Sequence, residues 1–428
     1  MTRFQIISLF IFGFLGIAGV LAFSGLFDNR AATGIGSIEI WGTLPETQIS
    51  NTFAQLQVNK TINFTVKYKG FSESEFDQSL IEALASGKGP DAIMLSQDLI
   101  AHYQDKIYAI PTSSYPARYI YDTFIDEAPV FISGQGIVGI PLVVDPMVAY
   151  WNKDMFSSAG IAVFPKTWDD LIKYVPSLTV KDARGGVSQS AVALGGYANI
   201  TNAKDIISTL LLQSGETIAT WTNDGSIQAR LGDNAPGALS FYTQFSDPSK
   251  TVYTWNSALD SSRQMFEAGK LAVYFGHASE YDDIRQKNPH LNFDVAVMPQ
   301  RALATAPAVY GKLYAFAVLQ ASPKKTNAFT AGSILSGSAV LQSIAVGARL
   351  APARRDLLSA GTIDPVLTIF NRAALISKGW LDPSPSASDK VFRDALESML
   401  SGQSKDNEAA TYISGQLQRL MPKNATSQ

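Results

Sequence analysis

Two short patterns in the 428-residue sequence could indicate nucleotide binding or catalysis. Residues 134–139 spell G-x-G-x-x-G, but a dinucleotide site needs a helix directly after these glycines, with its N-terminus at the pyrophosphate. A strand pattern and Pro141 follow instead. Residues 322–325 spell S-x-x-K, and Pro323 disfavours the helix that would bring the serine and lysine together. We therefore expect neither a nucleotide site nor a serine–lysine catalytic pair here.

Cysteine is absent, and the three histidines, His102, His277 and His290, lie far apart in the sequence. A chain without cysteine cannot form a disulfide or a thiolate metal site, and scattered histidines do not fit a histidine-rich site. The phosphate-binding pattern G-x-x-x-x-G-K-[ST] and the hydrolase patterns G-x-S-x-G and H-E-x-x-H are also missing. We expect no cofactor and no metal ion. Composition alone leaves a pair of glycosidase carboxylates open.

Side chains at the ends of predicted strands are candidates for holding a small polar molecule. Aromatic rings can cover its apolar faces, while carboxylates, amides and backbone groups fix its hydroxyls. Residues 37–41 and 92–95 have the composition of strands, and in open α/β sheets ligands lie beyond the carboxyl ends of the strands. The candidates selected in this way are Trp41, Gly42, Thr43, Gln97 and Asp98. A core position is an equal alternative for Trp41.

Two further tryptophans differ in their surroundings. Trp168 belongs to an apolar stripe at i, i+3, i+4 and i+7 with Leu171, Ile172 and Val175, which predicts a core position on an amphipathic helix. Trp255 lies in a polar, loop-like context, between Thr254 and Asn256. A large aromatic residue in such a loop indicates a position in or at the rim of a ligand site, with a core position as the alternative.

The elements that position these residues alternate between strands and helices. Strand patterns at residues 37–41, 65–68 and 92–95 are separated by helix patterns at 45–58 and 76–84. This order implies a mostly parallel sheet with helices on its faces.

The apolar region at residues 137–151 has the composition of buried strands. Proline has no N–H to donate to a ladder. We therefore expect three short strands here, interrupted at Pro141 and at Asp145-Pro146.

The N-terminus contains a candidate membrane segment, because residues 4–23 carry no charge and are mostly large and apolar. About 20 such residues span a bilayer core, and Arg3 before them favours an amino terminus inside the cell. Because a secretory signal usually has a shorter apolar region, of about 7–15 residues, we expect an uncleaved anchor. A signal cleaved near Ala22 or Ser24 is the alternative, and either segment would export the rest of the chain.

An ordered series of motifs carries a resemblance to a known family. The motifs read Gly139-Ile140-Pro141, Asp145, Tyr150-Trp151-Asn152-Lys153-Asp154, Ala159-Gly160-Ile161 and Pro165-Lys166-Thr167-Trp168-Asp169-Asp170-Leu171. Residues 266–273 (FEAGKLAV) and 352–355 (PARR) continue the series. This pattern resembles the extracellular solute-binding proteins of ABC importers, the group that includes maltose-binding protein. The resemblance covers about residues 37–421.

The resemblance implies an α/β fold of the two-lobe, class II periplasmic-binding-protein type, with a hinge and an interlobe cleft. An N-terminal transmembrane helix would precede it. The expected parts are an anchor or signal at 1–27, a tether at 28–36, lobe 1 at 37–144 plus 313–351, lobe 2 at 145–312 plus 352–421, and a tail at 422–428.

The resemblance also implies ligand contacts at positions that patterns alone do not single out. Asp145 would contact the ligand or the hinge, with a solvated turn carboxylate as the alternative. Tyr150 would face the cleft, unless it lies in the core. Gly276 and His277 would form a loop that touches ligand, or His277 would be an exposed loop histidine. Trp380 would supply another aromatic ring to the cleft.

The function implied by the resemblance is not enzymatic. The chain would bind a small solute, a sugar or oligosaccharide, by closing its lobes, and would present it to an ABC permease. The same scaffold in a sensor or surface-attachment protein, a non-sugar solute and a secreted carbohydrate-active enzyme are alternatives. A net charge of −3 gives no argument for nucleic acid. We expect a monomer, held at the cell membrane by residues 4–23 with its binding domain outside the cytoplasm, or secreted if the signal is cleaved.

Overall fold

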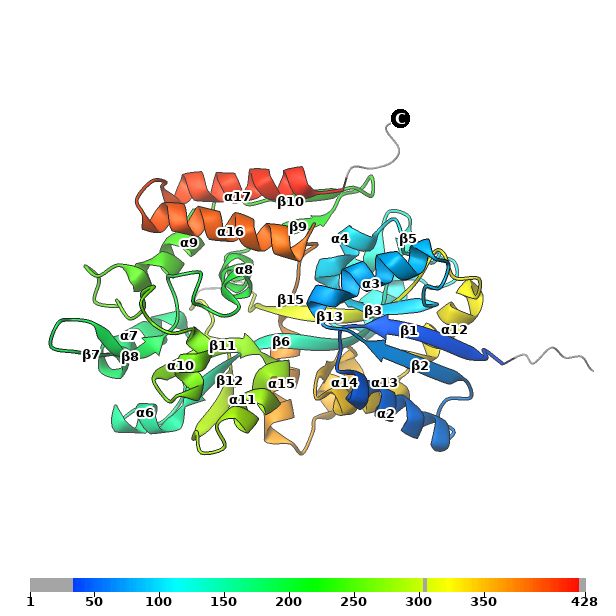
Figure 1. Ribbon diagram of the computed structural model, residues 1–428, viewed down its shortest axis with the longest axis horizontal. Helices are drawn as coiled ribbons and strands as arrows, with labels where there is room; N and C mark the ends of the chain where they lie inside the picture. The colour runs from blue at the N-terminus through cyan, green and yellow to red at the C-terminus, as the bar shows by residue number, and fades with distance from the viewer. Residues whose placement is uncertain (1–33, 303–305, 423–428) are drawn as a thin grey trace, which may run out of the picture.

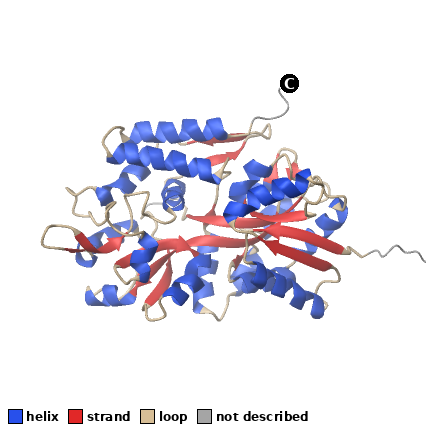
Figure 2. Ribbon diagram, viewed as in Figure 1, coloured by secondary structure: helices blue, strands red, loops and turns tan. Residues whose placement is uncertain are grey.

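The computed structural model describes residues 34–302 and 306–422 of the chain. They form two α/β lobes that share one sheet (Figure 1). Two long strands, β6 (Ile140–Asn152) and β13 (Val309–Val318), pair with each other in its middle. Helices lie on both sides of the central strands (Figure 2). The expected membrane segment at residues 4–23 lies outside the described residues.

Lobe 1 contains the alternating elements that the sequence predicts. Strand β1 (Ser37–Gly42) pairs in parallel with β2 (Thr65–Gly70) and β3 (Ala92–Ser96). The helices α2 (Glu46–Val58) and α3 (Glu73–Ala85) connect these strands. The predicted parallel arrangement is therefore correct for these strands, whereas β13 returns antiparallel to β3.

The prediction of three interrupted strands at residues 137–151 is wrong, because β6 is continuous from Ile140 to Asn152. Both prolines lie where the ladder already changes. Pro141 is next to a register shift opposite Tyr314/Ala315, and a bulge tolerates a residue without an N–H. Pro146 is the last residue that pairs with β13. Beyond it, β6 pairs with β11 (Leu271–His277) and β12 (Phe293–Val297), and so crosses from one lobe to the other.

Lobe 2 surrounds the second half of β6. Strand β11 also pairs in parallel with β8 (Val187–Val192). Helix α7 (Trp168–Leu178) begins at the predicted cap, because the Asp170 backbone N–H donates to Thr167 Oγ1 over 3.2 Å. Trp168 is buried, which confirms its predicted core position. Helices α16 (Pro385–Leu400) and α17 (Asp406–Leu420) pack on each other at the outer edge of this lobe (Figure 1).

The remaining elements are shorter or lie at the periphery. They are η1 (Gln97–Leu99), α4 (Ile100–Tyr103), α5 (Ala117–Thr123), η2 (Ala128–Phe131), β4 (Ile132–Ser133), β5 (Gly136–Ile137), α6 (Lys153–Ser158), β7 (Val180–Lys181), α8 (Ala203–Gln213), β9 (Ile218–Trp221), β10 (Ile227–Arg230), α9 (Ala235–Thr243), η3 (Gln244–Ser246), α10 (Ser262–Glu267), η4 (Ala278–Glu280), α11 (Tyr281–Lys287), α12 (Lys325–Leu335), α13 (Ser338–Ala348), β14 (Ala351–Pro352), α14 (Arg355–Ala360), α15 (Pro365–Leu375) and β15 (Ser377–Lys378).

Within the described ranges, no single helix has the length and apolar character needed to cross a membrane. Helices α12 and α13 satisfy the length and composition criteria only as a pair, and they are bent by 79° relative to each other.

Candidate functional site

Two adjoining cavities of about 580 and 560 Å³ lie between the lobes. Lobe 1 contributes the loop after β1, the start of α3 and, to the larger cavity, the end of β3. Lobe 2 contributes the start of α8 and the loop before α16 to the larger cavity, and η4 with α11 to the smaller. Thr43, Glu73, Asn202 and Lys312 line both cavities. The two cavities therefore form one interlobe cleft, divided by these four residues.

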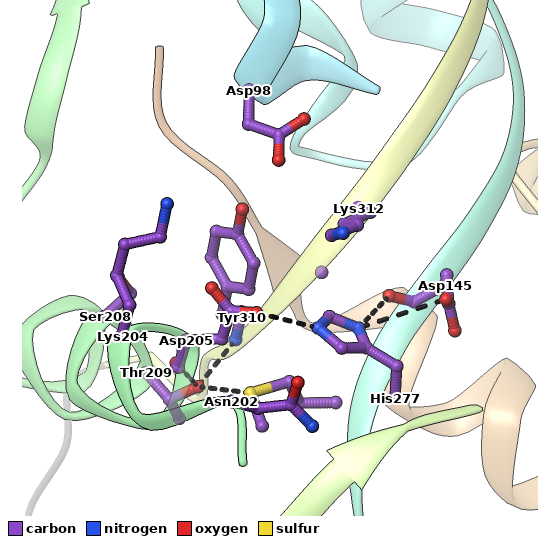
Figure 3. Close-up of polar contacts among 12 residues, drawn as sticks. Asp98, Asp145, Asn202, Lys204, Asp205, Ser208, Thr209, His277, Tyr310 and Lys312 are labelled. Carbon is purple, nitrogen blue, oxygen red and sulfur yellow. Dashed lines mark hydrogen bonds and ion pairs between the residues drawn. The ribbon is translucent and has the colours of Figure 1, made fainter. Parts of the chain in front are cut away.

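His277 ends β11 and lies between two carboxylates (Figure 3). Its Nε2 lies 2.9 Å from Asp205 Oδ2, and its Nδ1 lies 3.1 Å from the Asp145 backbone oxygen and 4.0 Å from Asp145 Oδ2. Burial disfavours the imidazolium, but the hydrogen bond to Asp205 and the charge of Asp145 outweigh it and raise the pKa of His277 to about 9. His277 therefore carries a positive charge at neutral pH.

Asp145 and Tyr150, both on β6, hold the loop that carries His277. The Ser279 backbone N–H donates to Asp145 Oδ1 over 2.9 Å, and the Tyr150 hydroxyl donates to the His277 backbone oxygen over 2.6 Å. Gly276 has no room for a side chain, because an added Cβ would lie 2.6 Å from the Tyr274 ring and 2.7 Å from Glu280. This loop is consequently fixed on the strand that crosses between the lobes.

Lys312 and Asp98 face the cleft from lobe 1. Lys312 lies opposite Asp145 in the β6–β13 ladder, and its ammonium donates to Glu73 Oε1 over 2.7 Å. Burial disfavours its charge, but the surrounding Tyr314 and Asp98 raise the pKa of Lys312 well above its usual value. Asp98 follows β3, accepts a hydrogen bond from the Ser96 hydroxyl, and is 6% exposed. Burial raises the pKa of Asp98.

The start of α8 brings a second lysine to the larger cavity. The Lys204 ammonium bonds to Asp382 Oδ2 at 2.7 Å, the Ser388 hydroxyl at 3.0 Å and the Pro385 backbone oxygen at 3.3 Å, so its three donors are used. It also lies 5.7 Å from the centre of the Trp380 ring. Asn202, directly before the helix, has a φ of 60°, a left-handed conformation that asparagine tolerates better than most residues.

Of the residues that the sequence selected, Thr43, Asp98, Asp145 and His277 line the cleft. Others lie directly behind these residues and line neither cavity. Gln97 is fully buried and bonds through its amide to the backbone of β13, at Gly311 and Leu313. The remaining residues of this second group are Gly42, Tyr150, Gly276 and Trp380.

Trp41 and Trp255 lie apart from this group. Trp41 is 7% exposed, donates to Glu39 Oε1 over 2.7 Å and packs against Phe71. Trp255 is fully buried in lobe 2, and its Nε1–H donates to Asn199 Oδ1 over 3.0 Å. The polar loop that suggested an open position for Trp255 instead supplies the acceptor that a buried indole requires. Both side chains hold the cores of their lobes, the alternative left open by the sequence.

Replacing Trp255 with phenylalanine is expected to lower stability without changing affinity for a solute. The change leaves Asn199 Oδ1 without its buried donor, which costs about 1–3 kcal/mol. Urea unfolding and ligand titration of the same variant would measure the two effects separately. A loss of affinity at unchanged stability would instead place Trp255 in the binding surface.

The sequence missed most of the charged residues of the cleft, namely Glu73, Asn202, Lys204, Asp205 and Lys312. A signal for Lys204 and Asp205 was present, because this charged pair begins an otherwise apolar helical segment. Lys312 follows Gly311 at the start of a predicted strand, and nothing in its neighbours distinguishes it from a surface lysine.

Across residues 34–302 and 306–422, no group of three or more histidine and carboxylate side chains could hold a metal ion. The His277 imidazole has carboxylates on both sides, but it donates to them as a cation and has no lone pair left for a metal. The arrangement is suited to hydrogen bonding with a polar molecule.

Comparison with known proteins identifies the family. Residues 47–331 match the family model described as bacterial extracellular solute-binding protein. The chain belongs to this family. The resemblance found in the sequence is therefore confirmed, and both the family and the fold are those of binding proteins.

Individual solute-binding proteins resemble the chain more distantly. A putative binding protein of Brucella abortus (strain 2308) is 24% identical over 267 residues, which make up 59% of this chain and 59% of that protein. The maltodextrin-binding protein MdxE of Bacillus subtilis (strain 168) is 25% identical over 222 residues, 50% of this chain and 48% of that protein. These matches span about half to three fifths of the relatives.

The fold is compared over a larger part of the chain. A cyclo/maltodextrin-binding protein, solved in complex with maltotetraose, superposes with a TM-score of 0.72 at 15% identity. The superposition covers 94% of this chain and 100% of that chain. It confirms the two-lobe periplasmic-binding-protein fold.

Proposed function

We propose that this protein is the extracytoplasmic solute-binding component of an ABC importer and binds a small solute, a sugar, between its lobes. The observation that carries the proposal is the interlobe cleft, in which charged and hydrogen-bonding groups from both lobes face one space. A solute in that space contacts both lobes at once, so binding favours the closed arrangement. The family and the maltodextrin-binding relatives support a sugar as the solute.

The proposal includes a division of the chain and a location. Lobe 1 comprises residues 37–144 and 313–351, and lobe 2 comprises residues 145–312 and 352–421. The protein acts as a monomer, presents its closed form to a permease, and is held at the membrane by residues 4–23. Thr43, Asp98, Asp145 and His277 contact the solute together with Lys312.

Full-length protein purified in detergent should be screened for thermal stabilisation by sugars, polyols, amino acids and peptides. A true ligand at 100 times its Kd adds about 2.7 kcal/mol to the free energy of unfolding, which raises the melting temperature measurably. Stabilisation by a sugar supports the proposal. A folded protein that no compound stabilises, or that only peptides stabilise, contradicts it.

A further inference from the structure

The aromatic rings that line the cleft are already occupied by protein contacts. Phe76, Tyr103, Tyr197, Tyr314 and Phe370 are each at most 6% exposed. Stacking on a sugar needs an open ring face of several carbon atoms. These rings offer little such surface to a ligand.

Arginines cover the ring faces of two tyrosines at the edges of the cleft. Arg393 lies 5.6 Å from the centre of the Tyr197 ring, and Arg349 lies 5.8 Å from that of Tyr281. Arg349 also pairs with Asp282 across the lobes at 3.0 Å. The faces that could stack on a chain of sugar rings are consequently taken by cations on at least one side.

Charged groups supply the free hydrogen-bonding capacity of the cleft. The Lys312 ammonium has three donors, and Glu73 is the one partner found for it among the described residues. One Asp98 oxygen accepts from Ser96 and one Asp205 oxygen bonds His277, which leaves a second oxygen of each carboxylate. Figure 3 shows the Asp98 carboxylate pointing toward the space between Lys204, Tyr310 and Lys312.

The mixture of charges disfavours an ionic solute. An anion next to Lys312 would also face Asp98 and Asp205, and a cation next to Asp98 would also face Lys204 and Lys312. Like charges held close together in a site of low dielectric constant repel strongly. A neutral solute avoids both repulsions, and its hydroxyls can donate to the carboxylates and accept from the lysine.

The cleft is also divided. Lys312 and Glu73, joined by a hydrogen bond of 2.7 Å, line both cavities and lie between them. An oligosaccharide that extended from one cavity into the other would have to displace this pair. A solute confined to the larger cavity can instead use Lys312 as its hydrogen-bond donor.

On the basis of the proposed function, we propose that the solute is a compact, neutral, hydroxyl-rich molecule, a monosaccharide or a polyol, and not a malto-oligosaccharide. Lys312 and Asp98 hold it from lobe 1, and Asp205 holds it from lobe 2.

The test is a titration of the full-length protein with four sets of probes. They are neutral monosaccharides and polyols, malto-oligosaccharides of two to four units, uronic acids, and amino sugars. We expect binding by at least one probe of the first set and none by maltotriose or maltotetraose. Tighter binding of a malto-oligosaccharide or of a charged sugar overturns the inference but leaves the proposed function intact. If no probe of any set binds, the proposed function fails and the inference fails with it.

Two variants connect the result to the cleft. Lys312→Met and Asp98→Asn keep the side-chain shape but remove a charged partner, so each should weaken binding about tenfold or more. Asp389→Asn is the matched control, because Asp389 lines the same cavity but both of its oxygens are used by Tyr197 and Arg393. Its affinity should change less than about threefold. Unchanged affinity in the Asp98 and Lys312 variants, with melting temperatures near that of the wild type, overturns the assignment.

Discussion

Replacing His277 with leucine should lower the free energy of unfolding at pH 6 by about 3–5 kcal/mol, the usual cost of breaking a buried ion pair from one side. The substitution leaves Asp205 buried without its hydrogen-bond donor at 2.9 Å and Asp145 without its nearest cation. Both carboxylates are at most 9% exposed, so water cannot take over the role of the imidazolium. Urea unfolding of the two proteins measures the difference.

The same loss should depend on pH in a defined direction. The pKa of His277 is about 9 in the folded protein, against 6.5 for an unperturbed histidine. The stabilisation is therefore fully present below pH 6.5 and disappears as the pH rises to 9, a change of about 3 kcal/mol. The difference between wild type and variant should narrow over this interval.

The chain offers a control in its second histidine–aspartate pair. His102 Nε2 lies 2.9 Å from Asp77 Oδ1, but the two side chains are 37% and 49% exposed. Exposed pairs contribute about 1 kcal/mol or less, so His102→Leu should have a small effect at every pH. Equal losses in the two leucine variants would contradict the role given to burial at His277.

These buried charges show where sequence analysis succeeds and where it stops. Apolar periodicity and capping patterns predicted the helices and strands of lobe 1, because burial of one face leaves a regular trace in the sequence. The ordered motifs located the crossover at β6. Pro141 and Pro146 misled the prediction of strand limits, because a proline is tolerated where the ladder bulges or changes partner, and pairing partners are not visible in one strand.

The candidate site could be predicted only in part for a related reason. Asp98 and Thr43 were found because parallel strands end at a common edge. Lys204 and Lys312 were not, since their position in the cleft depends on how two lobes distant in sequence face each other. Tryptophans were overestimated as ligand contacts, because a buried indole with an acceptor looks the same in sequence as an exposed one. Trp255 and Trp380 are both of this kind, bonded to Asn199 and Ser208.

Replacing Glu127 with glutamine should stabilise the protein at neutral pH, the opposite of what a buried polar substitution usually does. Glu127 is 5% exposed, and its Oε2 accepts from the Ser377 hydroxyl over 2.7 Å, but no partner is found for Oε1 among the described residues. Burial raises the pKa of Glu127 from 4.5 to about 8. A carboxyl group that must stay protonated when folded, but ionises when unfolded, favours unfolding as the pH rises above 4.5.

Glutamine keeps the shape and an oxygen for Ser377 but has no proton to lose. The variant should gain about 3 kcal/mol over wild type at pH 7, and the gain should shrink toward zero near pH 4.5. Glu216→Gln is the matched control, because Glu216 is also buried but accepts from the backbone N–H groups of Gly232 and Asn234. Loss of charge there weakens existing hydrogen bonds, so this variant should be less stable than wild type. A Glu127 variant that gains nothing at pH 7, or gains as much at pH 5, would show that the carboxyl group is ionised and solvated in the folded protein.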